Sequence, residues 1–94
     1  MTTILRSAQA GIEKKNDVLV EISPNENGSG ICIELSSPVS LEFGSQIEKT
    51  VRAVLHENEV NDCLVRVQDK GAMDFTLRAR TETAVHRATS EVRK

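Results

Sequence analysis

The sequence predicts a small α+β domain, a two-layer sandwich in which a small sheet carries two helices on one face. Three segments alternate apolar and polar residues with a period of two, which is typical of half-buried strands. Two longer segments repeat apolar residues at helical spacing. The predicted order is β-β-α-β-α, and its simplest arrangement packs the apolar stripe of each helix on one sheet face.

The first two expected strands, 17–23 and 31–35, flank a polar turn. Pro24 ends the first strand, and residues 25–30 are rich in Asn and Gly, which favours a turn. Two alternating strands around a short Asn/Gly connection predict a β-hairpin. The apolar residues expected on the inner face of these strands are Val18, Val20, Ile22, Ile31, Ile33 and Leu35.

The second half of the chain predicts a helix over 40–58, a strand over 63–68, a turn at 69–71 and a helix over 72–89. The apolar stripe of the first helix consists of Phe43, Ile47, Val51, Val54 and Leu55. The strand is expected to point Cys63, Val65 and Val67 inward, and the last helix to bury Met73, Leu77, Ala84, Val85 and Ala88.

Composition and charge limit the function classes. The chain has 94 residues, a net charge of −2, no Trp or Tyr and two Phe. A protein that neutralises nucleic-acid phosphates usually carries a basic excess, and stacking on single strands requires aromatic side chains. No apolar segment approaches the length of a membrane span, and no signal peptide begins the chain. We therefore expect a cytoplasmic protein that acts on neither nucleic acid nor membrane.

Few side chains offer chemistry of their own. His56 and His86 have no second ligand at metal spacing, so a surface position is expected for both. Cys63 is expected in the core, whereas Cys32 alternates outward. The arginines of the last helix (Arg78, Arg80 and Arg87) indicate either a solvated helix face or a docking surface for an acidic partner or a phosphate group. No enzyme acting alone is predicted.

Three stretches resemble the citrate lyase acyl carrier protein (gamma subunit) family over nearly the whole chain. They are Ala10-Gly11 followed after five residues by Asp17-Val18, Phe43-Gly44 before the amphipathic helix, and Asp69-Lys70-Gly71-Ala72-Met73-Asp74 running into Leu77-Arg78-Ala79-Arg80. The third stretch is the most specific of the three.

The resemblance implies a non-catalytic subunit of a complex that cleaves citrate to acetate and oxaloacetate in citrate fermentation. A family carrier holds 2'-(5''-phosphoribosyl)-3'-dephospho-CoA on a serine through a phosphodiester, and the terminal thiol carries acetyl and citryl groups. The implied partners are the alpha and beta subunits of citrate lyase, or of the similar citramalate lyase, and a prosthetic-group transferase. In this frame residues 1–16 are a flexible N-terminal arm with the prosthetic-group loop, and residues 17–94 are the carrier domain.

The family serine corresponds to Lys15 when the segment is counted from Gly11 and back from Asp17. A register shifted by one residue places Lys14 there instead. An amine does not form the serine phosphodiester, so two functions remain open. The chain is a covalent carrier that is modified at another position, or it is an unmodified paralogue or a chain with an altered loop that serves as a docking or scaffold module of the lyase complex. A small nucleic-acid-binding domain is a third, less supported hypothesis.

Overall fold

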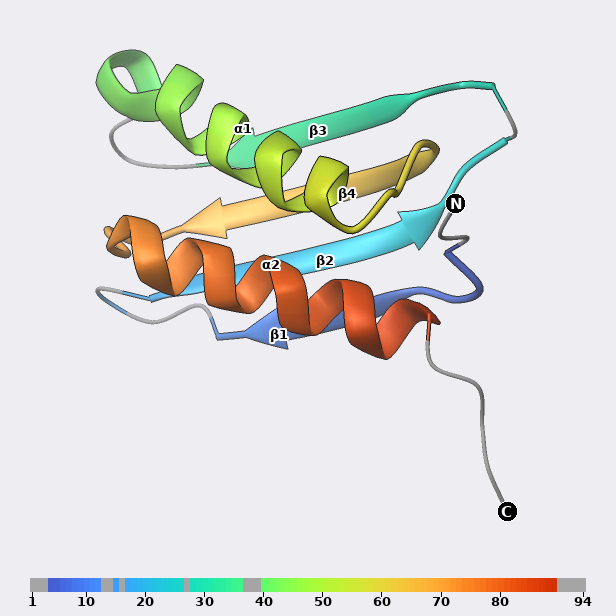
Figure 1. Cartoon of the computed structure of the whole chain (residues 1–94). Helices are drawn as coiled ribbons and strands as arrows, with labels where there is room; N and C mark the ends of the chain where they lie inside the picture. Colours follow the sequence, from blue (N-terminus) through green and yellow to red (C-terminus); the bar gives the residue numbers. More distant parts are fainter. Residues whose placement is uncertain (1–3, 13–14, 16, 27, 37–39, 90–94) are drawn as a thin grey trace.

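A four-stranded sheet forms one layer of the computed structural model, and two helices cover one of its faces (Figure 1). The structure describes residues 4–12, 15, 17–26, 28–36 and 40–89, without the side chains of 40–43. The elements are β1 (Ala8–Gly11), β2 (Val18–Pro24), β3 (Ile31–Ser36), α1 (Ser40–Glu57), β4 (Cys63–Asp69) and α2 (Asp74–Thr89). The predicted α+β class is confirmed, and the observed order β-β-β-α-β-α contains one more strand than expected.

The additional strand is β1, which lies where the sequence predicts an exposed arm. It pairs with β2 in antiparallel register, with Ala8 opposite Ile22 and Gly11 opposite Leu19. The residues before it are also attached, because the backbone amides of Leu5 and Arg6 donate to the carbonyl of Ala88 at the end of α2. Residues 4–11 are therefore part of the folded domain rather than an arm. Their Ala-Gln-Ala-Gly core has no β-branched residue, so local propensity does not reveal the strand.

The predicted hairpin between β2 and β3 is wrong, because β4 lies between these two strands. The sheet order is β1-β2-β4-β3, with β4 antiparallel to β2 and parallel to β3. Helix α1 makes the crossover connection that a parallel β3–β4 pair requires. A central position buries Cys63, Val65 and Val67 of β4, which are at most 1% exposed. The true hairpin is β1–β2.

The predicted inward faces of the strands are confirmed. Val18, Val20 and Ile22 are buried, and the corresponding residues of the edge strand β3 are half-buried against the core. Of the α1 stripe, Ile47 is half-buried and Val51, Val54 and Leu55 are buried, whereas the Phe43 side chain lies outside the described residues. In α2, Leu77, Ala84, Val85 and Ala88 are buried as predicted.

Met73 is the exception, because its side chain is 66% exposed rather than buried. It lies one residue before α2, and its carbonyl accepts the first hydrogen bonds of the helix, from the amides of Thr76 and Leu77. Residues at this capping position do not share the helix face, so the helical spacing that includes Met73 does not apply.

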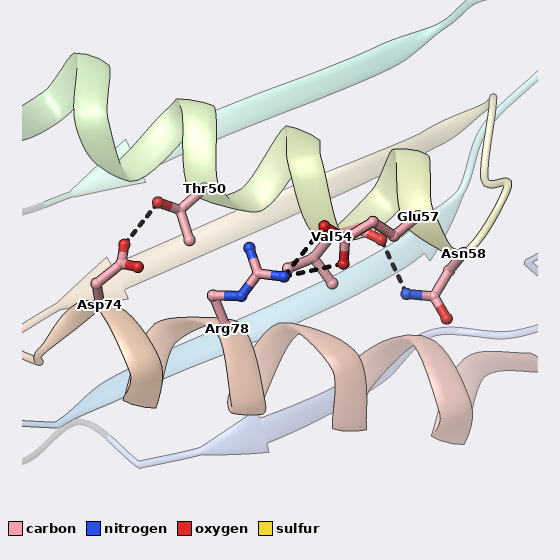
Figure 2. Close-up of polar contacts among 6 residues, drawn as sticks. All are labelled: Thr50, Val54, Glu57, Asn58, Asp74 and Arg78. Atoms are coloured by element: carbon pink, nitrogen blue, oxygen red, sulfur yellow. Dashed lines mark hydrogen bonds and ion pairs between the residues drawn. The ribbon is translucent and has the colours of Figure 1, made fainter.

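Two polar contacts join α1 to α2 (Figure 2). Thr50 bonds to Asp74 near the start of α2, and Arg78 donates to both oxygens of Glu57 at 2.9 and 3.1 Å. Asn58 closes the end of α1 by donating from its side chain to the carbonyl of Val54. The two helices therefore lie side by side as one layer over the sheet.

Candidate functional site

The β1–β2 connection, residues 12–17, contains the position that the family resemblance singles out. Lys15 is exposed in a turn, and Lys14, the alternative, lies outside the described residues. Gly11 opens the connection with a φ of +90°, a backbone conformation that favours glycine. An added Cβ at Gly11 meets the carbonyl oxygen of Val18 at 1.9 Å, so the two strands approach each other too closely for a side chain there.

Asp17 closes the connection and holds three groups. Its carboxylate accepts from the Val18 amide at 2.7 Å and from Arg80 of α2, whose Nε and Nη2 lie 3.3 and 3.1 Å from the two carboxylate oxygens. Its carbonyl accepts from the Lys70 amide at 2.9 Å. The β1–β2 connection is thus attached both to α2 and to the turn that follows β4.

That turn, residues 69–73, lies at the same end of the sheet as the β1–β2 connection (Figure 1). The buried carboxylate of Asp69 accepts from the Ala72 amide at 3.0 Å, and Gly71 has a φ of +94°. These features fold the chain back tightly before α2 begins. We call the surface formed by Ile12, Lys15, Asp17 and residues 69–75 the loop end.

Exposed apolar side chains occur in both segments of the loop end. The described large apolar residues that are at least half exposed are Leu5, Ile12, Met73 and Phe75, with exposures between 51% and 69%. Three of these four belong to the loop end, whereas Leu5 lies beside the far end of α2. Lys15 and Lys70 are exposed in the same two segments. Clustered exposed apolar groups beside charges are typical of protein interaction surfaces.

A pocket of about 300 Å³ adjoins this surface between α1 and the turn after β4. It is lined by Gln46, Ile47, Asp69, Gly71, Ala72, Asp74 and Leu77. Both Asp69 and Asp74 already accept hydrogen bonds within the chain. The pocket therefore offers a mostly apolar recess next to the loop end rather than a set of polar groups poised for catalysis.

The structure brings two of the three resemblance stretches together at the loop end. The three arginines of α2 each bond to a different partner. Arg80 bonds to Asp17, Arg78 bonds to Glu57, and Arg87 donates to the carbonyl of Gln9 at 2.9 Å. They do not form one solvated basic face. The Arg80–Asp17 contact joins residues 63 positions apart, and no local sequence pattern indicates it. The sequence also did not indicate that Phe75 is exposed. This apolar residue lies in the first turn of α2, and its side chain is 69% exposed.

The remaining candidate residues are the two histidines and the two cysteines. His56 and His86 are exposed and Cys63 is buried, as predicted, and Cys32, which alternates outward, is exposed. Burial raises the pKa of the Cys63 thiol to about 11, and the charge of Asp62 adds to the effect. Within the described residues, no group of three or more His, Cys, Asp or Glu side chains is arranged to hold a metal ion. No helix in this part of the chain has the length and apolar character to cross a bilayer.

The geometry of the β1–β2 connection bears on the attachment of a prosthetic group. The segment Ile12–Asn16 contains no Ser or Thr. Lys15 is exposed, but its side chain ends in an amine, and a phosphodiester requires a hydroxyl oxygen. Lys15 therefore does not fit the serine-linked prosthetic group of the family that the sequence resembles.

Comparisons with known proteins decide the family. The family described as malonate decarboxylase delta subunit (MdcD), an acyl carrier protein family, matches residues 5–88. The chain belongs to this acyl carrier protein family. It is 47% identical over 85 residues to a citrate lyase acyl carrier protein from Treponema denticola. The matched residues are 90% of this chain and 94% of that relative. A citrate lyase acyl carrier protein from Halothermothrix orenii is 39% identical over 85 residues, covering 90% and 88% of the two chains.

A solved structure shows the same fold. A chain of a Pseudomonas malonate decarboxylase hetero-tetramer in complex with malonate superposes with a TM-score of 0.75 at 19% identity, covering 93% of this chain and 88% of that chain. The match to the carrier family begins before β1, in agreement with the inclusion of residues 5–11 in the folded domain. The acyl carrier protein family predicted from the sequence is therefore confirmed.

Proposed function

We propose that this acyl carrier protein is a non-catalytic subunit of a citrate lyase complex and that it docks to the alpha and beta subunits through the loop end. The single observation that carries the proposal is the exposure of Ile12, Met73 and Phe75 at the same end of the sheet as the family attachment position. A carrier must present its attachment loop to the subunits that do the chemistry. Exposed apolar groups around that loop supply the area for such a contact.

The relatives support the choice of complex, because several curated relatives are named citrate lyase acyl carrier proteins at 39–47% identity. The similar citramalate lyase complex is an alternative partner of the same kind. The role of a carrier in either complex is to hold a tethered thiol, so the scarcity of catalytic side chains in this chain agrees with it. We infer that the protein works in the cytoplasm beside these enzymes.

Position 15 decides whether the chain can carry the prosthetic group of the family. The expected prosthetic group is phosphoribosyl-dephospho-CoA, and Lys15 does not provide the hydroxyl that its phosphodiester needs. We therefore favour the docking version of the function: the chain keeps the carrier fold and the docking surface and remains unmodified at position 15. The covalent carrier version then requires a serine to be restored in the β1–β2 connection.

The experiment coexpresses the tagged chain with the alpha and beta subunits and the prosthetic-group transferase of a citrate lyase. Affinity capture followed by intact-mass measurement separates docking from loading. We expect capture of the large subunits, an unmodified mass for the native chain, and a gain of the prosthetic-group mass in Lys15→Ser. Lys15→Ala is the matched control, and Lys14→Ser tests the register shifted by one residue.

Each part of the proposal has its own contrary result. Absence of the large subunits from the captured material contradicts the docking function. A native chain that carries the group contradicts the conclusion drawn from the Lys15 amine. If Lys14→Ser is loaded and Lys15→Ser is not, the attachment position is 14 and the alignment without a gap is wrong.

A further inference from the structure

The two ends of the β1–β2 connection are attached to the rest of the molecule more extensively than an exposed loop requires. At its start, Gly11 lies against the carbonyl of Val18, and an added Cβ comes within 3.2 Å of the Arg80 Cδ. At its end, Asp17 receives the Arg80 guanidinium and two backbone amides. Arg80 therefore bonds to the end of the connection and lies next to its start, from one position on α2.

We propose that Arg80 is the positioning residue of the β1–β2 connection and that its contact with Asp17 determines how position 15 is presented to a modifying enzyme. The part of this proposal that concerns modification rests on the proposed function. The part that concerns the geometry of the connection depends only on the contacts of Arg80, Asp17 and Gly11.

The chemistry of the contact suits a positioning role. The guanidinium is planar, and its Nε and Nη2 bond to separate oxygens of Asp17, so the contact restricts orientation as well as distance. The Asp17 side chain is only 20% exposed, compared with 41% for Arg80. Partial burial reduces the screening of this pair by water and salt. The carboxylate so held also accepts from the Val18 amide, which fixes the backbone three residues after position 15.

The same anchor reaches the second segment of the loop end, residues 69–75. The Asp17 carbonyl accepts from the Lys70 amide, so the orientation of Asp17 also sets the distance between the β1–β2 connection and the turn after β4. Arg80 thus holds position 15 in a constant relation to the exposed side chains of Met73 and Phe75. If a partner binds those side chains, it finds position 15 at a defined place.

Helix α2 supplies a matched control. Arg78 makes a comparable two-bond contact, with Glu57 of α1, and it is two residues from Arg80 on the same helix. Arg78→Gln removes a guanidinium–carboxylate contact without touching the β1–β2 connection. Any general weakening of α2 by loss of an arginine therefore appears in both variants, whereas loss of positioning appears only in Arg80→Gln.

The first measurement is hydrogen exchange of individual amides by NMR. In Arg80→Gln and in Asp17→Asn, we expect the Val18 and Lys70 amides to exchange about fivefold faster than in the native chain, because a partly buried ion pair makes a modest contribution. The Val60 amide, which bonds to Leu55 at the end of α1, is expected to keep its rate. The double variant Arg80→Gln/Asp17→Asn should equal either single variant, because both remove the same contact.

The second measurement concerns position 15 directly and needs no partner. Trypsin cleaves after lysine, and the native chain has Lys15 in the connection. We expect cleavage after Lys15 to be several-fold faster in Arg80→Gln and unchanged in Arg78→Gln. Arg80→Lys keeps the charge but loses the two-bond geometry, so it should restore only part of the native resistance.

The third measurement connects the contact to loading. In the Lys15→Ser chain, Arg80→Gln is expected to slow modification by the transferase about tenfold, mainly by lowering the maximal rate, whereas Arg78→Gln leaves it unchanged. Equal modification rates in the Arg80 and Arg78 variants would overturn the positioning role. Unchanged exchange at Val18 and Lys70 in Arg80→Gln would overturn it as well. If Lys15→Ser is not modified at all, the proposed attachment position fails, and the exchange and trypsin measurements still decide the role of Arg80.

Discussion

Thr50 of α1 donates a hydrogen bond of 2.7 Å from its hydroxyl to the carboxylate of Asp74, the first residue of α2 (Figure 2). The Thr50 side chain is buried between the two helices, and Asp74 stands where the helix dipole favours a negative charge. The bond therefore couples the middle of α1 to the start of α2, next to the loop end. It contributes to the position of the surface on which the proposed docking depends.

Replacing Thr50 by Val tests this coupling. The valine side chain has nearly the same shape, but it leaves Asp74 without the hydroxyl donor, and we expect the free energy of unfolding to fall by about 1 kcal/mol. Urea denaturation followed by circular dichroism measures the change. Thr50→Ser is the control that keeps the hydroxyl, and a Val variant as stable as the native chain would show that the bond contributes nothing.

A comparison of substitutions at Gly11 and Gly28 tests the close packing at the start of the β1–β2 connection. Both have φ near +90°, but only Gly11 has a backbone oxygen where a Cβ would lie, and nothing lies within 4 Å of such a Cβ at Gly28. Gly28→Ala is expected to cost about 1 kcal/mol from the backbone conformation alone. Gly11→Ala adds the clash and is expected to cost about 3 kcal/mol or more.

Denaturation of the two glycine variants under identical conditions gives the comparison. The difference between them isolates the steric contribution, because the backbone contribution is similar in both. Equal losses of stability would mean that β1 moves away from β2 at little cost, and the tight approach of the two strands would then not be a requirement of the fold.

The two cysteines are expected to differ in reactivity in the native protein. Cys32 is exposed, whereas burial raises the pKa of the Cys63 thiol to about 11, so Cys63 has almost no thiolate at pH 8. A thiol reagent should label one site in the folded chain and two in denaturant, as counted by intact mass. Cys32→Ser should abolish labelling of the folded chain, and residual labelling of this variant would contradict the burial of Cys63.

The raised pKa of Cys63 also predicts a loss of stability at high pH. Below about pH 9 the thiol is protonated in both folded and unfolded chains, so it has no effect on their balance. Between about pH 9 and about pH 11 the unfolded chain releases this proton and the folded chain retains it, so the free energy of unfolding falls as the pH rises. Cys63→Ala should show a shallower decline over this range, and parallel declines in the two chains would contradict the assignment.

The exposed apolar residues allow a direct test of the docking surface. Phe75 and Leu5 are exposed to similar extents, but Phe75 lies at the loop end and Leu5 beside the opposite end of α2. Phe75→Ser is expected to weaken binding to the large subunits at least about tenfold, as loss of a buried aromatic contact does. Leu5→Ser should leave binding unchanged, and calorimetry with the purified large subunits measures both. Equal effects of the two substitutions would move the interface away from the loop end.

Most of the elements could be predicted because their signals are local. The alternation of Val18, Val20 and Ile22 and the helical stripe ending at Val54 and Leu55 depend only on the period of each element. The observed bounds of α1 and β4 differ from the predicted ones by one residue at one end. The proposed attachment position, Lys15, rests on the family stretches alone and remains a prediction.

The edge strand and the order of the strands could not be predicted in this way. Ala8 and Gln9 belong to a strand because β2 offers them a pairing partner and Ala88 anchors the residues before them. Likewise, β4 lies between β2 and β3 because it pairs its backbone with both of them and packs its apolar face beside theirs. Pairing of this kind joins residues far apart in sequence, and local alternation does not select among partners.

The sequence by itself determined the α+β class, the inward faces of the strands and the lysine at position 15, since periodicity and residue type are properties of short segments. Only the tertiary structure decided that Arg80 bonds to Asp17, that Met73 and Phe75 are exposed at the same end of the sheet as the β1–β2 connection, and that residues 4–11 are folded. These relations arise when the helix layer packs on the sheet, because packing brings segments from both halves of the chain to one end of the molecule.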